Sequence, residues 1–203
     1  MSNSLRILTY NTQMRSALME MGFPPSIPPV YTAPERAKLI SRAIIESPVE
    51  IDVVCLNEIF DEPARAILSS ELEIEFPFLV SKADTFHTRL VSPGISDDLM
   101  EKVWELTFGP LEDLSALAKL KFEDSGLFLA SRLPFVTVPT PPEVQALLGP
   151  FAFPQGVPVV RFFMYGDSSD NDKFAAKGVL YAALKTAQGV RHIFLSHTQA
   201  DTD

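Results

Sequence analysis

The sequence predicts an α/β or α+β fold in which at least one β-sheet is covered by helices. Apolar runs of strand length alternate along the chain with segments that have helical periodicity. Several of these runs are almost continuously apolar, which is typical of strands buried on both faces. The 203 residues, of which 46% are hydrophobic, suit one domain over residues 1–203.

The first predicted elements are a strand and a helix. Residues 5–10 have the composition of a strand, which we expect to end at Asn11. The helix begins at about Thr32, because Thr32 and Glu35 form a capping-box pattern and Pro34 is tolerated in a first turn. Apolar residues then recur at helical spacing.

A second strand is predicted over residues 51–56, a nearly continuous apolar run that ends at Asn57 and Glu58. The remaining elements follow from the same signals. They are a helix over 61–70, two helical stretches within 97–121, and strands over 126–130, 157–165, 178–185 and 191–196. Gly189 suits a tight turn between the last two strands.

Composition excludes several classes of protein. The single cysteine, Cys55, excludes an intramolecular disulfide framework and a multi-cysteine zinc site. The formal charge of −9 counts against binding of nucleic acid through a general basic field. No apolar run approaches the roughly 20 residues that span a bilayer. The first ten residues do not resemble an export signal, so we expect a cytoplasmic protein, or a secreted one if the N-terminus is incomplete.

Three polar residues follow apolar strands: Asn11, Glu58 and His197. Strand ends are where ligand crevices open in layered α/β proteins. Glu58 is the best metal candidate, because magnesium often uses one or two carboxylates and completes its shell with water and substrate phosphate. The alternative is that Glu58 lies near the positive end of the following helix and binds nothing.

His197 and Lys177 are the candidate partners of a phosphoryl group. His197 could donate a hydrogen bond to a phosphoryl oxygen or to a leaving group, and a structural histidine is the equal alternative. Lys177 could meet a phosphate or pair with Asp172, and the alternative is a flexible acidic loop over 167–173. The chain lacks a Walker loop, a dinucleotide-binding glycine motif, a G-x-S-x-G elbow and an H-E-x-x-H motif.

Four segments in order resemble the endonuclease/exonuclease/phosphatase superfamily of divalent-metal phosphodiesterases and phosphatases. They are Leu5 to Asn11, Asp52 to Glu58, Ser125 to Pro134 and Ile193 to Gln199. Within that superfamily the details are most similar to the neutral sphingomyelinases of bacterial type. The similar details are Asn57-Glu58-Ile-Phe-Asp61, Lys177-Gly-Val179, Ser196-His-Thr-Gln-Ala-Asp201 and the Asp172 to Lys177 spacing.

The resemblance implies a four-layer sandwich of two mixed β-sheets flanked by helices. It also implies hydrolysis of sphingomyelin to ceramide and phosphocholine with Mg²⁺, or with Mn²⁺ or Co²⁺ in its place. On matching positions Glu58 would hold the metal, Asn11 would orient phosphate or a metal-bound water, and His197 would hydrogen-bond the phosphoryl group. Lys177 and Asp172 would give electrostatic support.

The sequence departs from the family pattern after His197. The family continues to a G-D-x-N segment and a terminal S-D-H, and this sequence ends at Asp203 without them. We therefore expect the C-terminal part of the fold to be missing, and most activity with it, because catalytic groups that act together are strongly non-additive.

Three alternatives to the sphingomyelinase interpretation stay open. Two of them, a phosphoinositide phosphatase and a nuclease, belong to the same superfamily. The third is a non-catalytic remnant that binds lipid or phosphate. Transient contact with a membrane surface through residues 99–108 and 23–29 is a further hypothesis, against which a covering helix is the default.

Overall fold

The computed structural model describes residues 4–14, 30–83, 89–90, 106, 125–149, 153, 155–165 and 177–197. The helical stretches expected within 97–121, both segments proposed for membrane contact and Asp172 lie outside the described residues, apart from the single residue 106. No helix in the described ranges is long and apolar enough to cross a bilayer.

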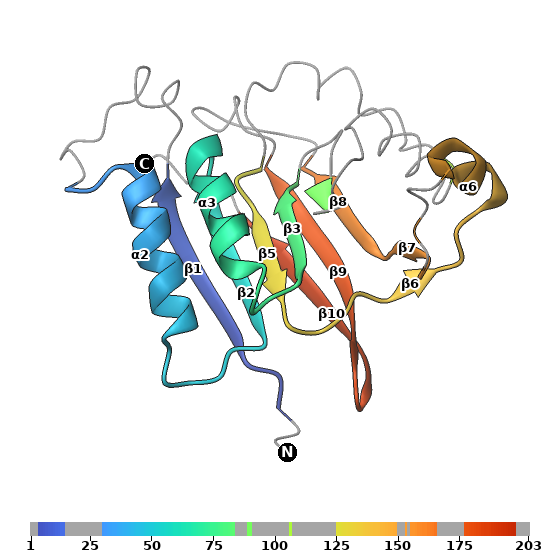
Figure 1. Ribbon diagram of the computed structural model, residues 1–203, viewed down its shortest axis with the longest axis horizontal. Helices are drawn as coiled ribbons and strands as arrows, with labels where there is room; N and C mark the ends of the chain where they lie inside the picture. The colour runs from blue at the N-terminus through green and yellow to red at the C-terminus, as the bar shows by residue number, and fades with distance from the viewer. Residues whose placement is uncertain are drawn as a thin grey trace.

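The first sheet has five strands and is mixed. Its order is β1 (Ile7–Met14), β2 (Val53–Ile59), β5 (Phe128–Ser131), β3 (Phe78–Lys82) and β4 (Arg89–Leu90). β1 and β2 are parallel, and the other neighbours are antiparallel. Two helices, α2 (Ala33–Ile45) and α3 (Glu62–Leu72), cover one face of this sheet (Figure 1).

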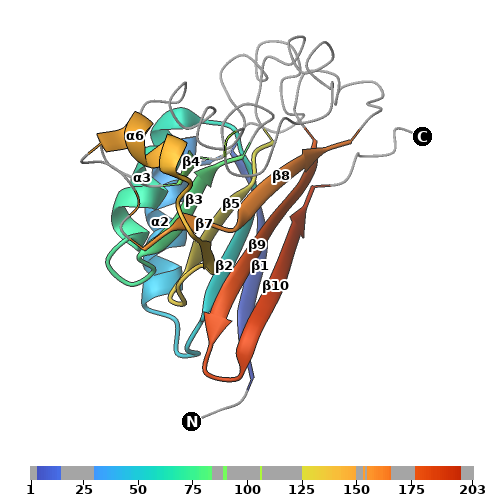
Figure 2. The ribbon, with the colours of Figure 1, turned by 90° about the vertical axis from the view of Figure 1, so that its right-hand side faces the viewer.

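A second sheet packs on the opposite face of the first. Its described strands are antiparallel, in the order β10 (Gly189–Ser196), β9 (Gly178–Thr186) and β8 (Val160–Met164). Figure 2 shows the two sheets stacked beside each other. The small pair β6 (Thr137–Val138) and β7 (Val157–Pro158) and the short helix α6 (Pro142–Leu148) lie at one side.

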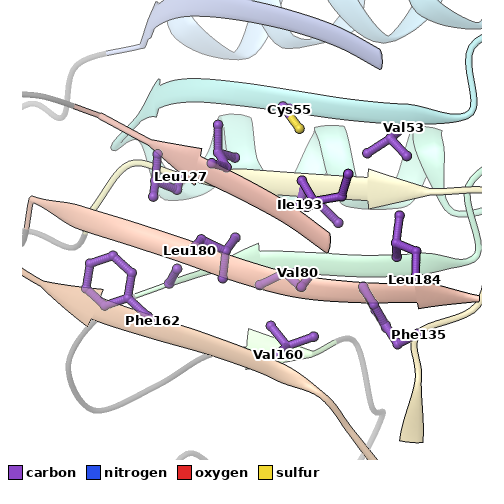
Figure 3. Close-up of a cluster of buried hydrophobic side chains, with 14 residues drawn as sticks. Val53, Cys55, Val80, Leu127, Phe135, Val160, Phe162, Leu180, Leu184 and Ile193 are labelled. Atoms are coloured by element: carbon purple, nitrogen blue, oxygen red, sulfur yellow. The ribbon is translucent and has the colours of Figure 1, made fainter. Parts of the chain in front are cut away.

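The space between the two sheets is filled by one apolar cluster, seen in close-up in Figure 3. Val53, Cys55 and Val80 from the first sheet meet Leu180 and Ile193 from the second. A second cluster joins the other face of the first sheet to α2 and α3. β2 and β5 are therefore buried on both faces, as their continuous apolar runs predict.

The predicted α+β sandwich is confirmed. The described residues form one layer of helices and two layers of β-sheet. The helix that begins after Thr32 carries the expected capping box, in which Thr32 Oγ1 accepts from Glu35 N and the Glu35 carboxylate accepts from Thr32 N at 2.9 Å. The hairpin around Gly189 is also confirmed, with Gly189 at φ +110°.

Two predicted strand ends are wrong. β1 does not stop at Asn11 but continues to Met14, and β2 continues through Asn57 and Glu58 to Ile59. Backbone pairing explains the extension, because Ile59 N donates to Gly126 O and Phe60 N donates to Met14 O. The strand predicted over 157–165 is split at Val159, because β7 pairs with β6 whereas β8 pairs with β9.

Candidate active site

Four of the five predicted site residues lie at one end of the two sheets. Asn11 and Glu58 are near the C-terminal ends of the parallel strands β1 and β2, whose register pairs Asn11 with Asn57. Lys177 immediately precedes β9 and His197 immediately follows β10, and these two strands are antiparallel. The C-terminal ends of β1, β2 and β10 and the beginning of β9 lie at the same end of the sandwich (Figures 1 and 2).

The backbone of the first sheet is irregular at this end. Gln13 has φ +51° and Glu58 has φ +60°, and the pairing of β1 with β2 shifts register between Asn11 and Met14. Left-handed conformations cost residues with a Cβ about 1–2 kcal/mol, and they concentrate at functional sites. Asn11 and Glu58 therefore lie within distorted strands and not in loops that follow them.

The carboxylate of Glu58 is the charged centre of the cluster. Its Oε1 lies 3.2 Å from Nε2 of His197, and the side chain of Asn11 also hydrogen-bonds it. The hydrogen bond from His197 lowers the pKa of Glu58 to about 2, with help from Asn11 and the charge of Lys177, against the opposing effect of burial. Glu58 is therefore ionised at neutral pH.

The side chains of Lys177, His197 and Glu58 lie in contact one after another. The Lys177 ammonium nitrogen lies 2.7 Å from Nδ1 and 3.0 Å from Nε2 of His197. An ammonium group has only donors, so the nearer nitrogen, Nδ1, accepts. The other ring nitrogen, Nε2, is the one that faces the Glu58 carboxylate.

The aromatic ring of Phe60 packs beside Lys177 and His197. The Phe60 ring centroid lies 5.5 Å from the Lys177 ammonium nitrogen and 6.4 Å from the ring centroid of His197. Lys177 is only 6% exposed, so the ring face offers the buried ammonium a cation–π contact. Gly126, at φ +66°, makes room for Phe60, because a Cβ there would lie 2.7 Å from the ring.

Asn57 joins the two sheets beside the cluster. Its Nδ2 donates to the carbonyl oxygen of Ser196 at 3.3 Å, across 139 positions of sequence. Asn57 precedes Glu58, and Ser196 precedes His197. This hydrogen bond therefore ties together the backbones that carry the two interacting side chains.

The structure brings Asn11, Glu58, Lys177 and His197 together, and their roles stay predictions. His192 lies on the exposed side of β10, where its Nδ1 is 2.8 Å from the hydroxyl oxygen of Tyr181. Sequence reasoning missed the buried Thr12 and the supporting ring of Phe60. Phe60 could have been found, because it is the phenylalanine of the N-E-x-F-D motif that contains Glu58. No sequence pattern pointed to Thr12.

Glu58 and Asn11 offer oxygen donors, the kind that magnesium prefers. No cluster of three or more His, Cys, Asp or Glu residues capable of holding a metal occurs within the described ranges. Glu58 supplies one ionised carboxylate that is 22% exposed, beside the amide of Asn11. Magnesium is commonly bound through one or two carboxylates plus water and substrate phosphate, so this set fits it.

Comparison with known proteins supports the fold. No protein-family model and no curated protein matches the chain. Among solved structures, SmcL is 19% identical with a TM-score of 0.61, over 98% of this chain and 50% of SmcL. Sphingomyelinase C from Streptomyces griseocarneus is 20% identical with a TM-score of 0.59, over 99% of this chain and 51% of that enzyme.

The beta toxin of Staphylococcus aureus is also similar. Its β-hairpin deletion mutant is 18% identical with a TM-score of 0.61, over 99% of this chain and 53% of the toxin. Another mutant of the same toxin, with bound magnesium ions, is 17% identical with a TM-score of 0.58. The similarity covers 98% of this chain and 51% of that mutant. This chain therefore has the fold of the bacterial sphingomyelinases and spans about half the length of those proteins.

Proposed function

We propose that this chain is part of a magnesium-dependent phosphodiesterase that hydrolyses sphingomyelin to ceramide and phosphocholine. The observation that carries the proposal is the convergence of Glu58, His197 and Lys177, which two different sheets contribute. A carboxylate next to fixed cationic and neutral donors matches what phosphoryl transfer requires, namely a metal ligand and groups that stabilise charge on phosphoryl oxygens.

Each side chain has a distinct part in this proposal. Glu58 would hold the metal, for which Mn²⁺ and Co²⁺ are alternatives to Mg²⁺, and Asn11 orients the bound phosphate. His197 donates a hydrogen bond to a phosphoryl oxygen or to the leaving oxygen. Lys177 keeps positive charge beside it, and Asp172 would add electrostatic support from outside the described residues. When bound, the metal would neutralise negative charge that develops on the phosphoryl group.

The choice of a lipid substrate rests on two further observations. A formal charge of −9 is unfavourable for holding a polyanionic nucleic acid. The N-E-x-F-D and S-H-T-Q segments resemble those of sphingomyelinases, and each contributes to the site: Glu58 and Phe60 belong to the first, and His197 belongs to the second. The similarity to sphingomyelinase structures adds support through the fold alone.

Phosphocholine release from sphingomyelin in detergent micelles tests the proposal in the full-length protein. We expect turnover that EDTA abolishes and that added Mg²⁺ restores. His197→Asn should remove most of it, whereas His192→Asn, a change of the same chemistry on the outer side of β10, should leave it intact. Parallel assays on DNA and inositol phosphates test the nuclease and phosphatase alternatives. Metal-independent turnover, or selective cleavage of either other class, contradicts the sphingomyelinase proposal.

A further inference from the structure

One buried hydroxyl group contacts the backbone on both sides of the metal candidate. Thr12 lies in β1 and is 3% exposed. Its Oγ1 lies 2.9 Å from the carbonyl oxygen of Asn57 and 3.1 Å from the carbonyl oxygen of Glu58, both on the neighbouring strand β2. The single hydroxyl hydrogen is thus shared between two successive carbonyl groups.

This contact requires a break in the strand. In a regular strand, backbone groups of successive residues point to opposite sides, so one hydroxyl group cannot reach two successive carbonyl oxygens. The break is at Glu58, whose φ is +60°. Glutamate has no intrinsic preference for this left-handed conformation, which therefore has to be imposed by its surroundings.

We propose that Thr12 is a positioning residue, which holds Glu58 in its left-handed conformation and thereby directs the carboxylate toward His197. The hydroxyl group of Thr12 accomplishes this by pulling both carbonyl groups to the β1 side of β2. The consequences for metal binding rest on the function proposed above, whereas the backbone part of the inference does not.

A double-mutant cycle in urea tests the backbone part without any need for activity. Glycine adopts a left-handed conformation without the steric cost that alanine meets. With Thr12 present, we expect Glu58→Gly to unfold at a higher urea midpoint than Glu58→Ala. With Thr12→Val, which keeps the shape and removes the donor, residue 58 is free to become extended, and this advantage of glycine should disappear. The same advantage with and without Thr12→Val would overturn the inference.

Binding of Mn²⁺ alone, followed by electron paramagnetic resonance, tests the functional consequence in the full-length protein. Loss of residues that orient a metal ligand typically weakens metal binding about 10–100-fold. We expect a loss of this size in Thr12→Val and none in Thr12→Ser, which keeps the hydroxyl group. Thr9→Val, an exposed position on the same strand, is the matched control.

The two measurements separate this inference from the proposed function. Failure of the wild type to bind Mn²⁺ counts against the proposed metal site, and the urea cycle then decides the role of Thr12 alone. Unchanged Mn²⁺ affinity in Thr12→Val refutes positioning of the ligand. If Thr12→Val does not fold, Thr12→Cys, in which the donor is much weaker, takes its place in both measurements.

Discussion

Replacement of Glu58 by glutamine should remove a specific part of the dependence of stability on pH. The pKa of Glu58 falls from 4.5 to about 2 in the folded protein. At about 1.4 kcal/mol for each pKa unit, this difference corresponds to about 3 kcal/mol of stabilisation by the charged form. The side chain is 22% exposed, so solvent screening makes this value an upper bound.

The sign of the effect follows from linkage. A carboxylate whose pKa is lower in the folded state contributes its stabilisation fully above the unfolded pKa, here 4.5. The contribution decreases as the pH falls and is lost at the folded value of about 2. Glu58→Gln should therefore be less stable than the wild type at pH 6, and the two should converge as the pH is lowered from 4.5 toward 2.

Urea unfolding followed by circular dichroism at a series of pH values between 6 and 2 measures this difference. Glu71→Gln, on the exposed surface of α3, is the control for loss of one negative charge. At each pH, the free energy of unfolding of each variant is subtracted from that of the wild type. This difference cancels the titration of carboxylates that the two proteins share. A Glu58→Gln difference that stays constant over this pH range, or that matches the Glu71→Gln difference, would refute the assigned environment of Glu58.

Three further changes test other parts of the argument. Lys177→Met should lower kcat for sphingomyelin about 100-fold or more, because it removes a buried positive charge from beside His197; a steady-state assay showing unchanged kcat contradicts this role. Gly126→Ala should lower the free energy of unfolding by about 1–3 kcal/mol, because its Cβ would meet Phe60 at 2.7 Å; thermal unfolding at the wild-type temperature excludes the clash. Thr32→Ala should cost about 1 kcal/mol through loss of the cap bond to Glu35, which urea unfolding measures.

Local physics explains why much of the fold was predictable from the sequence. The Thr32–Glu35 capping box depends on two side chains within one helical turn. The burial of β2 on both faces follows from its continuous apolar run, and the last hairpin from Gly189. Each of these patterns lies within a few residues of the structure that it predicts, so each can be recognised from the sequence alone.

The strand ends were predicted wrongly because their cause is not local. Asn57 and Glu58 look like residues that end a strand, since they are polar and follow an apolar run. They remain in β2 because Gly126 and Met14, from two other segments, accept their neighbours' backbone hydrogen bonds. A polar side chain indicates contact with solvent or with a ligand. It does not indicate where the backbone pairing of a strand ends.

The sequence by itself indicated the helices α2 and α3, most of the strands and four candidate side chains near strand ends, but it did not indicate β3 or α6. Only the tertiary structure decided that Glu58 meets His197 at 3.2 Å, because 139 positions separate them and the contact depends on how two sheets stack. Tertiary structure likewise imposed the left-handed backbone at Glu58 and gave Thr12 a partner on β2. Periodicity records which face of an element is buried, whereas the packing of whole sheets selects the residues that meet across it.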